Sequence, residues 1–136
     1  MIVREALVSD PRVLAADAPA RAAAELLLRP NVKSALVVDG DRLVGCVSVE
    51  GIVRAVAAGA DLRTLPVEAI CERDVTTIAP DAPLDQALRL MGERDLERLP
   101  VMEDGRLVGV LPREPLLRRL AEDEAPSEDD ESFGYR

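Results

Sequence analysis

An internal repeat constrains the fold of this chain more than any other feature. When the sequence is shifted by 64 positions, residues 3–56 align with residues 67–120 without a gap. Arg42-Leu43-Val44-Gly45 meets the same four residues at 106–109, and Asp17-Ala18-Pro19 meets the same three at 81–83. A gapless match of this length indicates two copies of one structural unit.

Each copy predicts a helix that begins at Asp-Ala-Pro. Aspartate caps the free amides of a starting helix, and proline fits the first turn because it has no amide hydrogen to lose there. The apolar residues that follow have helical spacing. They are Ala20, Ala23, Ala24 and Leu27 in the first copy and Leu84, Ala87, Leu88 and Met91 in the second.

Each copy then predicts a β-hairpin and a second helix. The apolar runs 35–38 and 43–49 are joined through Asp39-Gly40, and the runs 99–102 and 107–111 are joined through Asp104-Gly105. Asp-Gly between apolar runs is a hairpin signal. The final helices carry apolar residues at 52, 53 and 56 and at 116, 117 and 120, and each copy opens with a short strand, near 13–15 and 75–79.

The unit is therefore strand, helix, hairpin, helix in roughly 54 residues, which is too small to bury much surface alone. We expect an α/β (α+β) fold in which the repeats, about 3–58 and 67–120, pack face to face about a pseudo-two-fold axis and share one core. Residues 1–120 would form this module. Residues 121–136 carry a net charge of −6, against −3 for the rest, and we expect an acidic, disordered tail there.

Composition excludes several classes of function. The only aromatic residues are Phe133 and Tyr135, and no basic run is present, so we expect no nucleic-acid partner. No apolar run is long enough for a signal peptide or membrane span, which favours a cytoplasmic protein with no membrane partner.

The absence of histidine argues against an enzyme, because histidine suits acid-base catalysis near neutral pH. Cys46 is interpreted as a structural thiol. A disulfide between Cys46 and Cys71 is not expected in the cytoplasm.

The second copy resembles the CBS domain, named after cystathionine β-synthase. The resemblance rests on Val75-x-x-Ile78-x-Pro80-Asp81-x-Pro83-Leu84-x-x-Ala87, then Arg98-Leu99-Pro100-Val101, then Gly105-Arg106-Leu107-Val108-Gly109-Val110-Leu111. It implies a paired module that often dimerises and binds AMP, ADP, ATP, NAD or S-adenosylmethionine between the repeats. It further implies a stand-alone sensor that regulates an enzyme or transporter, with an adenosine-containing effector and no required cofactor.

Both copies depart from the family's ribose-binding pattern, in which a Thr or Ser precedes, by three residues, an Asp that accepts the ribose hydroxyls. The first copy has Ser48 but Gly51 at the Asp position, and the second has Pro112 and Pro115. Glu50 and Glu114 lie one residue earlier and could replace the Asp. The favoured alternative is that each complements the dipole of a starting helix.

Three arginines are candidates for binding a phosphate group of the ligand, namely Arg12, Arg98 and Arg113, although each could equally be a solvated surface residue. Val13, Leu14, Thr76 and Thr77 complete the set of predicted ligand contacts. If one cleft is functional we expect the first, because Ser48 and Gly51 leave room whereas Pro112 and Pro115 remove backbone donors. The alternative function is a ligand-free interaction module that binds another copy or a partner protein through its helices.

Overall fold

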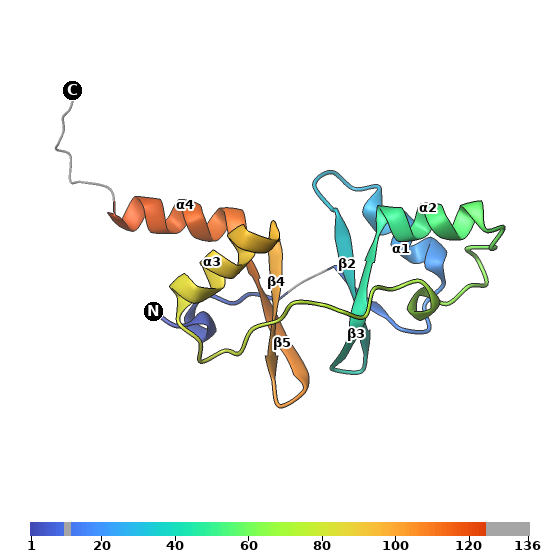
Figure 1. Ribbon diagram of the computed structural model, residues 1–136. Helices are drawn as coiled ribbons and strands as arrows, with labels where there is room; N and C mark the ends of the chain where they lie inside the picture. Colours follow the sequence, from blue (N-terminus) through green and yellow to red (C-terminus); the bar gives the residue numbers. More distant parts are fainter. Residues whose placement is uncertain (10–11, 125–136) are drawn as a thin grey trace, which may run out of the picture.

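The computed structural model describes residues 1–9 and 12–124 of this 136-residue chain. The two repeats form two similar α+β halves, with their strands toward the middle of the molecule and their helices on the outside (Figure 1). The fold class predicted from the repeat is confirmed.

The first repeat contains a three-stranded sheet and two helices. Its strands have the order β1-β2-β3, with β1 parallel to β2 and β3 antiparallel to it. The first helix buries most of the face predicted from its apolar spacing, including Ala20, Ala23 and Leu27. The second buries less of its predicted face, since Val53 and Val56 are exposed. The elements are β1 (Val13–Ala15), α1 (Ala20–Leu27), β2 (Ser34–Asp39), β3 (Arg42–Ser48) and α2 (Val49–Ala57).

The second repeat has the same order of elements but a smaller sheet. Its hairpin pairs two strands in the register of the first repeat, including a β-bulge at the equivalent place. Its turn residues Asp104 and Gly105 both have positive φ, of 54° and 79°, as a tight hairpin requires. The elements are α3 (Leu84–Arg94), β4 (Arg98–Glu103), β5 (Arg106–Pro112) and α4 (Arg113–Glu124).

The strand predicted near 75–79 is wrong, because only Ile78 forms a bridge there, to Val101. In the first repeat the Leu36 amide donates to the carbonyl of Arg12 at 2.9 Å and helps to hold β1. The equivalent of Leu36 is Pro100, which has no amide hydrogen. The second repeat therefore lacks the hydrogen bond that would begin this strand.

The helix starts were predicted correctly, but their caps were not. Pro19 and Pro83 are the N-cap residues, and neither Asp17 nor Asp81 caps its helix. Main-chain carbonyls cap the helices instead, since the Ala20 amide donates to the Leu65 carbonyl at 2.7 Å and the Leu84 amide donates to the Met1 carbonyl at 3.0 Å. Leu65 and Met1 are themselves 64 residues apart, so the arrangement is repeated.

These contacts belong to an exchange of short segments between the repeats. The 3-10 turn η1 (Val3–Glu5) packs with the second repeat, where the Val3 amide donates to the Ala82 carbonyl at 3.0 Å. The turn η2 (Val67–Ala69) packs with the first, where the Val67 amide donates to the Ala18 carbonyl at 2.8 Å. Figure 1 shows the N-terminal segment beside α3.

The prediction of one shared core is wrong, since the structure has two apolar clusters. One joins residues of η1 to α3, β4, β5 and α4, and the other joins Val67 of η2 to α1, β2 and β3. Val3 and Val67 are both fully buried. Each repeat completes its own core with the turn it receives, so the halves meet mainly through these segments and through contact between β3 and β5.

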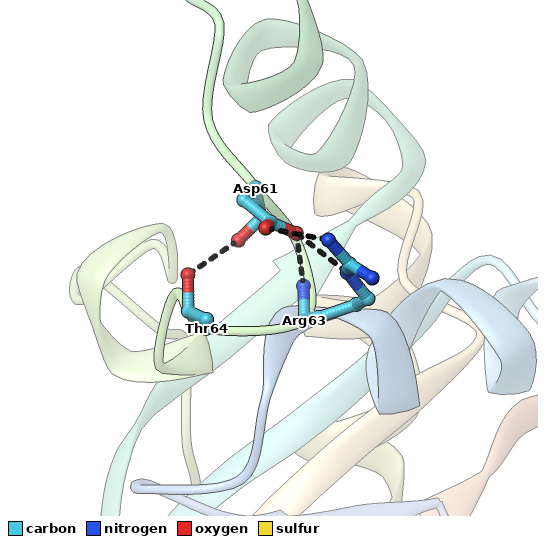
Figure 2. A network of polar contacts seen from close by, with 3 residues as sticks. All are labelled: Asp61, Arg63 and Thr64. Atoms are coloured by element: carbon cyan, nitrogen blue, oxygen red, sulfur yellow. Dashed lines mark hydrogen bonds and ion pairs between the residues drawn. The ribbon is translucent and has the colours of Figure 1, made fainter.

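A hydrogen-bonded turn fixes the linker between α2 and η2 (Figure 2). The Asp61 carboxylate accepts from the Arg63 amide at 3.0 Å and from the Arg63 guanidinium, and its carbonyl accepts from the Thr64 hydroxyl at 3.3 Å. The turn places the Leu62 and Leu65 carbonyls where they accept from the first amides of α1. The linker is thus part of the helix cap.

The last helix, α4, continues to Glu124, although the acidic tail was predicted to begin at residue 121. The remainder of that predicted tail, residues 125–136, lies outside the described residues. Among the residues that are described, no helix is long and apolar enough to cross a membrane.

Candidate functional site

A cavity of about 340 Å³ lies where β3 passes into α2. The segment that follows η2 crosses β3 here, with Cys46 and Glu72 exchanging two main-chain hydrogen bonds of 2.9 and 2.6 Å. Between this crossing segment and the first turn of α2 the surface is hollow. The cavity is lined by Cys46, Ser48, Glu50, Gly51, Arg54, Ala55, Ile70, Cys71 and Glu72.

Ser48 and Gly51, two of the predicted ligand contacts, both line this cavity, and they also bond to each other. Ser48 is the N-cap of α2, and its hydroxyl accepts from the Gly51 amide at 3.3 Å. A side chain at position 51 would begin 3.2 Å from the Ile70 carbonyl oxygen. The crossing segment therefore occupies some of the space that the family's ribose-binding Asp would need.

Glu50 lines the cavity, and its carboxylate forms an ion pair with Arg54 one turn later. Glu114 forms the equivalent pair with Arg118, at 2.9 Å. Both glutamates are in the first turn of their helix, where a negative charge complements the helix dipole. The geometry fits the interpretation that the sequence favoured, while leaving the Glu50 carboxylate beside the cavity.

The second repeat has an equivalent main-chain crossing at the corresponding place. Val8 pairs with Val110 through two main-chain hydrogen bonds of 2.9 and 2.8 Å, and Leu7 packs against Gly109. Pro112 ends β5 and Pro115 lies in the first turn of α4. The expectation that the first cleft is the functional one, if either is, stays a prediction.

Arg12 and Arg98 lie together in a different cavity, of about 140 Å³, between the repeats. Its lining includes Asn31 and Asp95, which are equivalent residues of the two copies and both have positive φ. The Arg113 guanidinium lies at 3.9 Å from the Asp95 carboxylate. The three predicted phosphate ligands are thus near the pseudo-two-fold axis and do not line the cavity beside α2.

The remaining predicted contacts are dispersed. Val13 lines a shallow cavity of about 190 Å³ beside β5, and Leu14 packs against the core of the first repeat. The Thr76 hydroxyl accepts from Arg94 at 3.3 Å, while Thr77 is exposed. The eleven predicted residues therefore fall in several places rather than one.

Sequence reasoning did not select Ile70, Cys71 or Glu72 as site residues. The signal was present in the glycines that recur at 45 and 109. A Cβ at Gly45 would collide with the Glu72 carbonyl oxygen, and one at Gly109 would lie 2.9 Å from the Val8 carbonyl oxygen. A repeated glycine inside a strand indicates close approach by another main chain.

The two cysteines are free thiols, and both line this cavity. The pKa of Cys46 is raised, chiefly by burial and then by the charges of Glu72 and Cys71. The Cys71 thiol donates to the Glu68 carbonyl at 3.4 Å. A protonated Cys46 is an inert part of the wall at neutral pH.

The sequence profile of the CBS domain matches this chain twice, at residues 3–58 and 67–122. The chain belongs to the CBS-domain family. The resemblance noted from the sequence is thereby confirmed, and the two halves of the structure are its two CBS repeats.

This CBS pair is similar to parts of larger proteins. It is 30% identical over 122 residues to the A-adding tRNA nucleotidyltransferase of Aquifex aeolicus, covering 89% of this chain and 14% of that protein. It is 32% identical over 102 residues to protein MJ1232 of Methanocaldococcus jannaschii, covering 74% of this chain and 33% of that protein. The chain therefore spans about a third or less of these relatives.

Solved CBS structures share the fold. The CBS domain pair of protein MJ0100, in complex with 5′-methylthioadenosine and S-adenosyl-L-methionine, is 25% identical with a TM-score of 0.68 and covers 91% of this chain and 98% of its own. Hypoxic Response Protein I, with two coordinated zinc ions, is 21% identical with a TM-score of 0.71 and covers 88% of this chain and 98% of its own. The second comparison supports the fold alone.

Proposed function

We propose that this CBS pair is a cytoplasmic, non-catalytic regulatory module that binds an adenosine-containing ligand in the cavity beside α2 and signals to a partner protein. The observation that carries the proposal is the 340 Å³ cavity between the first turn of α2 and the segment 70–72. Such a volume lies within the range of small-molecule sites. The MJ0100 pair, which holds two adenosine derivatives, supports the ligand class.

Different lining residues suit different parts of an adenosine-containing ligand. Ile70 and Ala55 are apolar groups that could contact a base. The Glu50 carboxylate, which pairs with the Arg54 guanidinium, can also accept hydrogen bonds from ribose hydroxyls. Arg54 offers a guanidinium to a phosphate or carboxylate. AMP, ADP, ATP, NAD and S-adenosylmethionine all combine these features.

Thermal denaturation with and without each nucleotide tests the proposal. A ligand at 100 times its dissociation constant should stabilise the folded state by about 2.7 kcal/mol. Arg54→Ala should weaken that stabilisation, whereas Arg118→Ala should not, because Arg118 forms the same kind of ion pair but lies in the other repeat. If millimolar AMP, ATP, NAD and S-adenosylmethionine all leave the melting temperature unchanged, the proposal is wrong.

A second candidate function, that of an interaction module without a ligand, is supported by an exposed apolar face on the first repeat. Leu28 is 84% exposed, and Val49, Val53 and Val56 on α2 are each at least half exposed. A face of this kind commonly binds protein. The proposed occupant is a second copy, giving a homodimer.

Light scattering tests this second candidate. The wild type should have twice the mass of one chain, and Val53→Lys should reduce the mass to the 14.7 kDa of a single chain without loss of helix content by circular dichroism. A wild-type mass of one chain at every concentration would exclude the homodimer.

A further inference from the structure

At the equivalent positions 4 and 68 the two repeats carry opposite charges, and this difference points to a ligand. In the second repeat, Arg4 of η1 bonds to two carboxylates. Its Nη2 atom lies 3.4 Å from Asp81 Oδ1 and 2.6 Å from Glu103 Oε2. Asp81 lies just before α3 and Glu103 is the last residue of β4, and the single guanidinium pairs with both carboxylates.

The first repeat has the same two acidic positions, because Asp17 and Asp39 are the equivalents of Asp81 and Glu103. Its residue at the position of Arg4 is Glu68. The main chain holds both residues in the same way: the Arg4 amide donates to the Pro80 carbonyl at 2.8 Å, and the Glu68 amide donates to the Ala16 carbonyl at 3.1 Å. A carboxylate thus replaces a guanidinium on an otherwise equivalent frame.

This replacement coincides with a cavity. A space of about 350 Å³ is lined by Asp17, Asp39 and Glu68, with small side chains such as Ala16 between them. Arg73 also lines it, and its guanidinium donates to the Glu68 carbonyl oxygen at 3.5 Å. Three carboxylates and one guanidinium give this lining a net charge of −2.

The positive group that would suit this acidic cavity is a guanidinium rather than a metal ion. No set of three or more carboxylate or thiol side chains in residues 1–9 and 12–124 is arranged to hold a metal. A planar guanidinium has five donors and can span carboxylates that are too far apart to coordinate one ion. The second repeat demonstrates this, because Arg4 spans the equivalent pair.

We propose that the acidic cavity of the first repeat binds a guanidinium group supplied from outside the chain, in the position that Arg4 fills in the second repeat. The sources of such a group are free arginine and an arginine side chain of a partner protein. The site is separate from the cavity beside α2, so the proposal stands independently of nucleotide binding.

Nuclear magnetic resonance titration of the full chain tests the proposal and separates the two sources. Acetyl-Gly-Arg-Gly-amide represents a protein side chain, L-arginine represents the free amino acid, and acetyl-Gly-Lys-Gly-amide controls for positive charge. We expect the amide resonances of residues 15–17, 38–40 and 68 to shift with one or both guanidinium probes. Absence of these shifts at millimolar concentration, or equal shifts with the lysine peptide, would overturn the proposal.

Supplying the guanidinium within the chain is the complementary test. Glu68→Arg should pair with Asp17 and Asp39, abolish the response to the guanidinium probe, and raise the melting temperature in a way that high salt removes. Glu93→Arg, the same charge change on an exposed position of α3, should leave the response intact. A Glu68→Arg protein that binds the probe like the wild type would contradict the proposal.

A milder variant covers the case in which Glu68→Arg does not fold. Asp39→Asn keeps the shape of the side chain and removes one charge, so it should weaken probe binding roughly threefold, the effect expected for an exposed ion pair. Unchanged binding in Asp39→Asn would likewise contradict the proposal.

Discussion

Gly45 is the residue on which the crossing of β3 by residues 70–72 most directly depends. Its missing side chain leaves room for the Glu72 carbonyl oxygen, which accepts from the Cys46 amide at 2.9 Å. Gly45→Ala places a Cβ against this main chain, which cannot move as a flexible side chain would. We expect the free energy of unfolding to fall by roughly 1–3 kcal/mol, as for other overpacked sites, measured by urea denaturation.

Gly92 provides the matched control for this prediction. It lies within α3, and a Cβ there would be 3.6 Å from an Arg113 nitrogen, an ordinary contact. Gly92→Ala should therefore stabilise the protein by up to about 1 kcal/mol through helix propensity. Equal effects of the two substitutions would show that steric conflict does not limit position 45.

Asp61 makes stability depend on pH. Hydrogen bonds from the Arg63 side chain, and then from the Arg63 amide, lower the pKa of its carboxyl group. Because the folded-state pKa is the lower one, the stabilisation is complete above the unfolded pKa of about 3.9 and is lost as pH falls through the folded-state value.

Comparison with Asp61→Asn isolates this effect. The melting temperature of the variant should lie below that of the wild type near neutral pH, and the difference should shrink as the pH is lowered from about 6 to about 3. Thermal denaturation followed by circular dichroism measures it. A difference that stays constant over this range would mean that the charge of Asp61 does not stabilise the linker turn.

At the scale of elements, Pro100 explains why the second repeat has a two-stranded sheet. Pro100→Leu supplies the residue found at the equivalent position 36 and restores an amide that can donate to the Thr76 carbonyl. We expect hydrogen exchange at residue 100 to be slow, with little change in the free energy of unfolding. The new hydrogen bond contributes about 1 kcal/mol, which the greater freedom of the unfolded chain largely offsets.

The reciprocal substitution has a larger expected effect. Leu36→Pro removes the 2.9 Å hydrogen bond to the Arg12 carbonyl and should detach β1, with faster exchange of the Ala16 amide. Fast exchange at residue 100 in Pro100→Leu, or unchanged exchange in Leu36→Pro, would separate the sheet difference from this hydrogen bond.

The elements themselves were predictable where local patterns decide them. The hairpins and the helix starts after Pro19 and Pro83 follow from turn residues and apolar spacing, which act over a few positions. The capping by Asp17 and Asp81 was predicted wrongly because Leu65 and Met1, far away in sequence, provide the carbonyls. In the candidate site, Ser48 and Gly51 were likewise predictable from a motif, whereas Ile70 to Glu72 enter through a long-range crossing.

At the scale of the whole molecule, the exchange of η1 and η2 decides how the two cores are made. The repeat suggested one shared core, because a unit of this size buries little apolar surface alone. In the structure each half instead enlarges its own core with a short turn that belongs, in sequence, to the other repeat. The repeat pattern cannot show whether each turn packs on its own repeat or on the other one, because the two repeats offer equivalent positions for it.

The exchange of the two turns can be tested at Val3 and Val67, because each valine packs in the core of the other repeat. Val3 belongs to the first repeat in sequence but is fully buried in the core of the second. Val3→Ala should lower the free energy of unfolding by roughly 2 kcal/mol. Hydrogen exchange should quicken mainly in α3, β4 and β5, while β2 and β3 keep their protection.

Val67→Ala is the mirror experiment, since Val67 is equally buried but packs in the core of the first repeat. Its faster exchange should appear in α1, β2 and β3. Faster exchange of β2 and β3 in Val3→Ala would instead mean that each turn stays with its own repeat in solution. If the expected pattern is found, each exchanged turn stabilises the repeat on which it packs. Residues 70–72 line the α2 cavity and directly follow η2, so a structural change at this cavity can pass from one half of the molecule to the other.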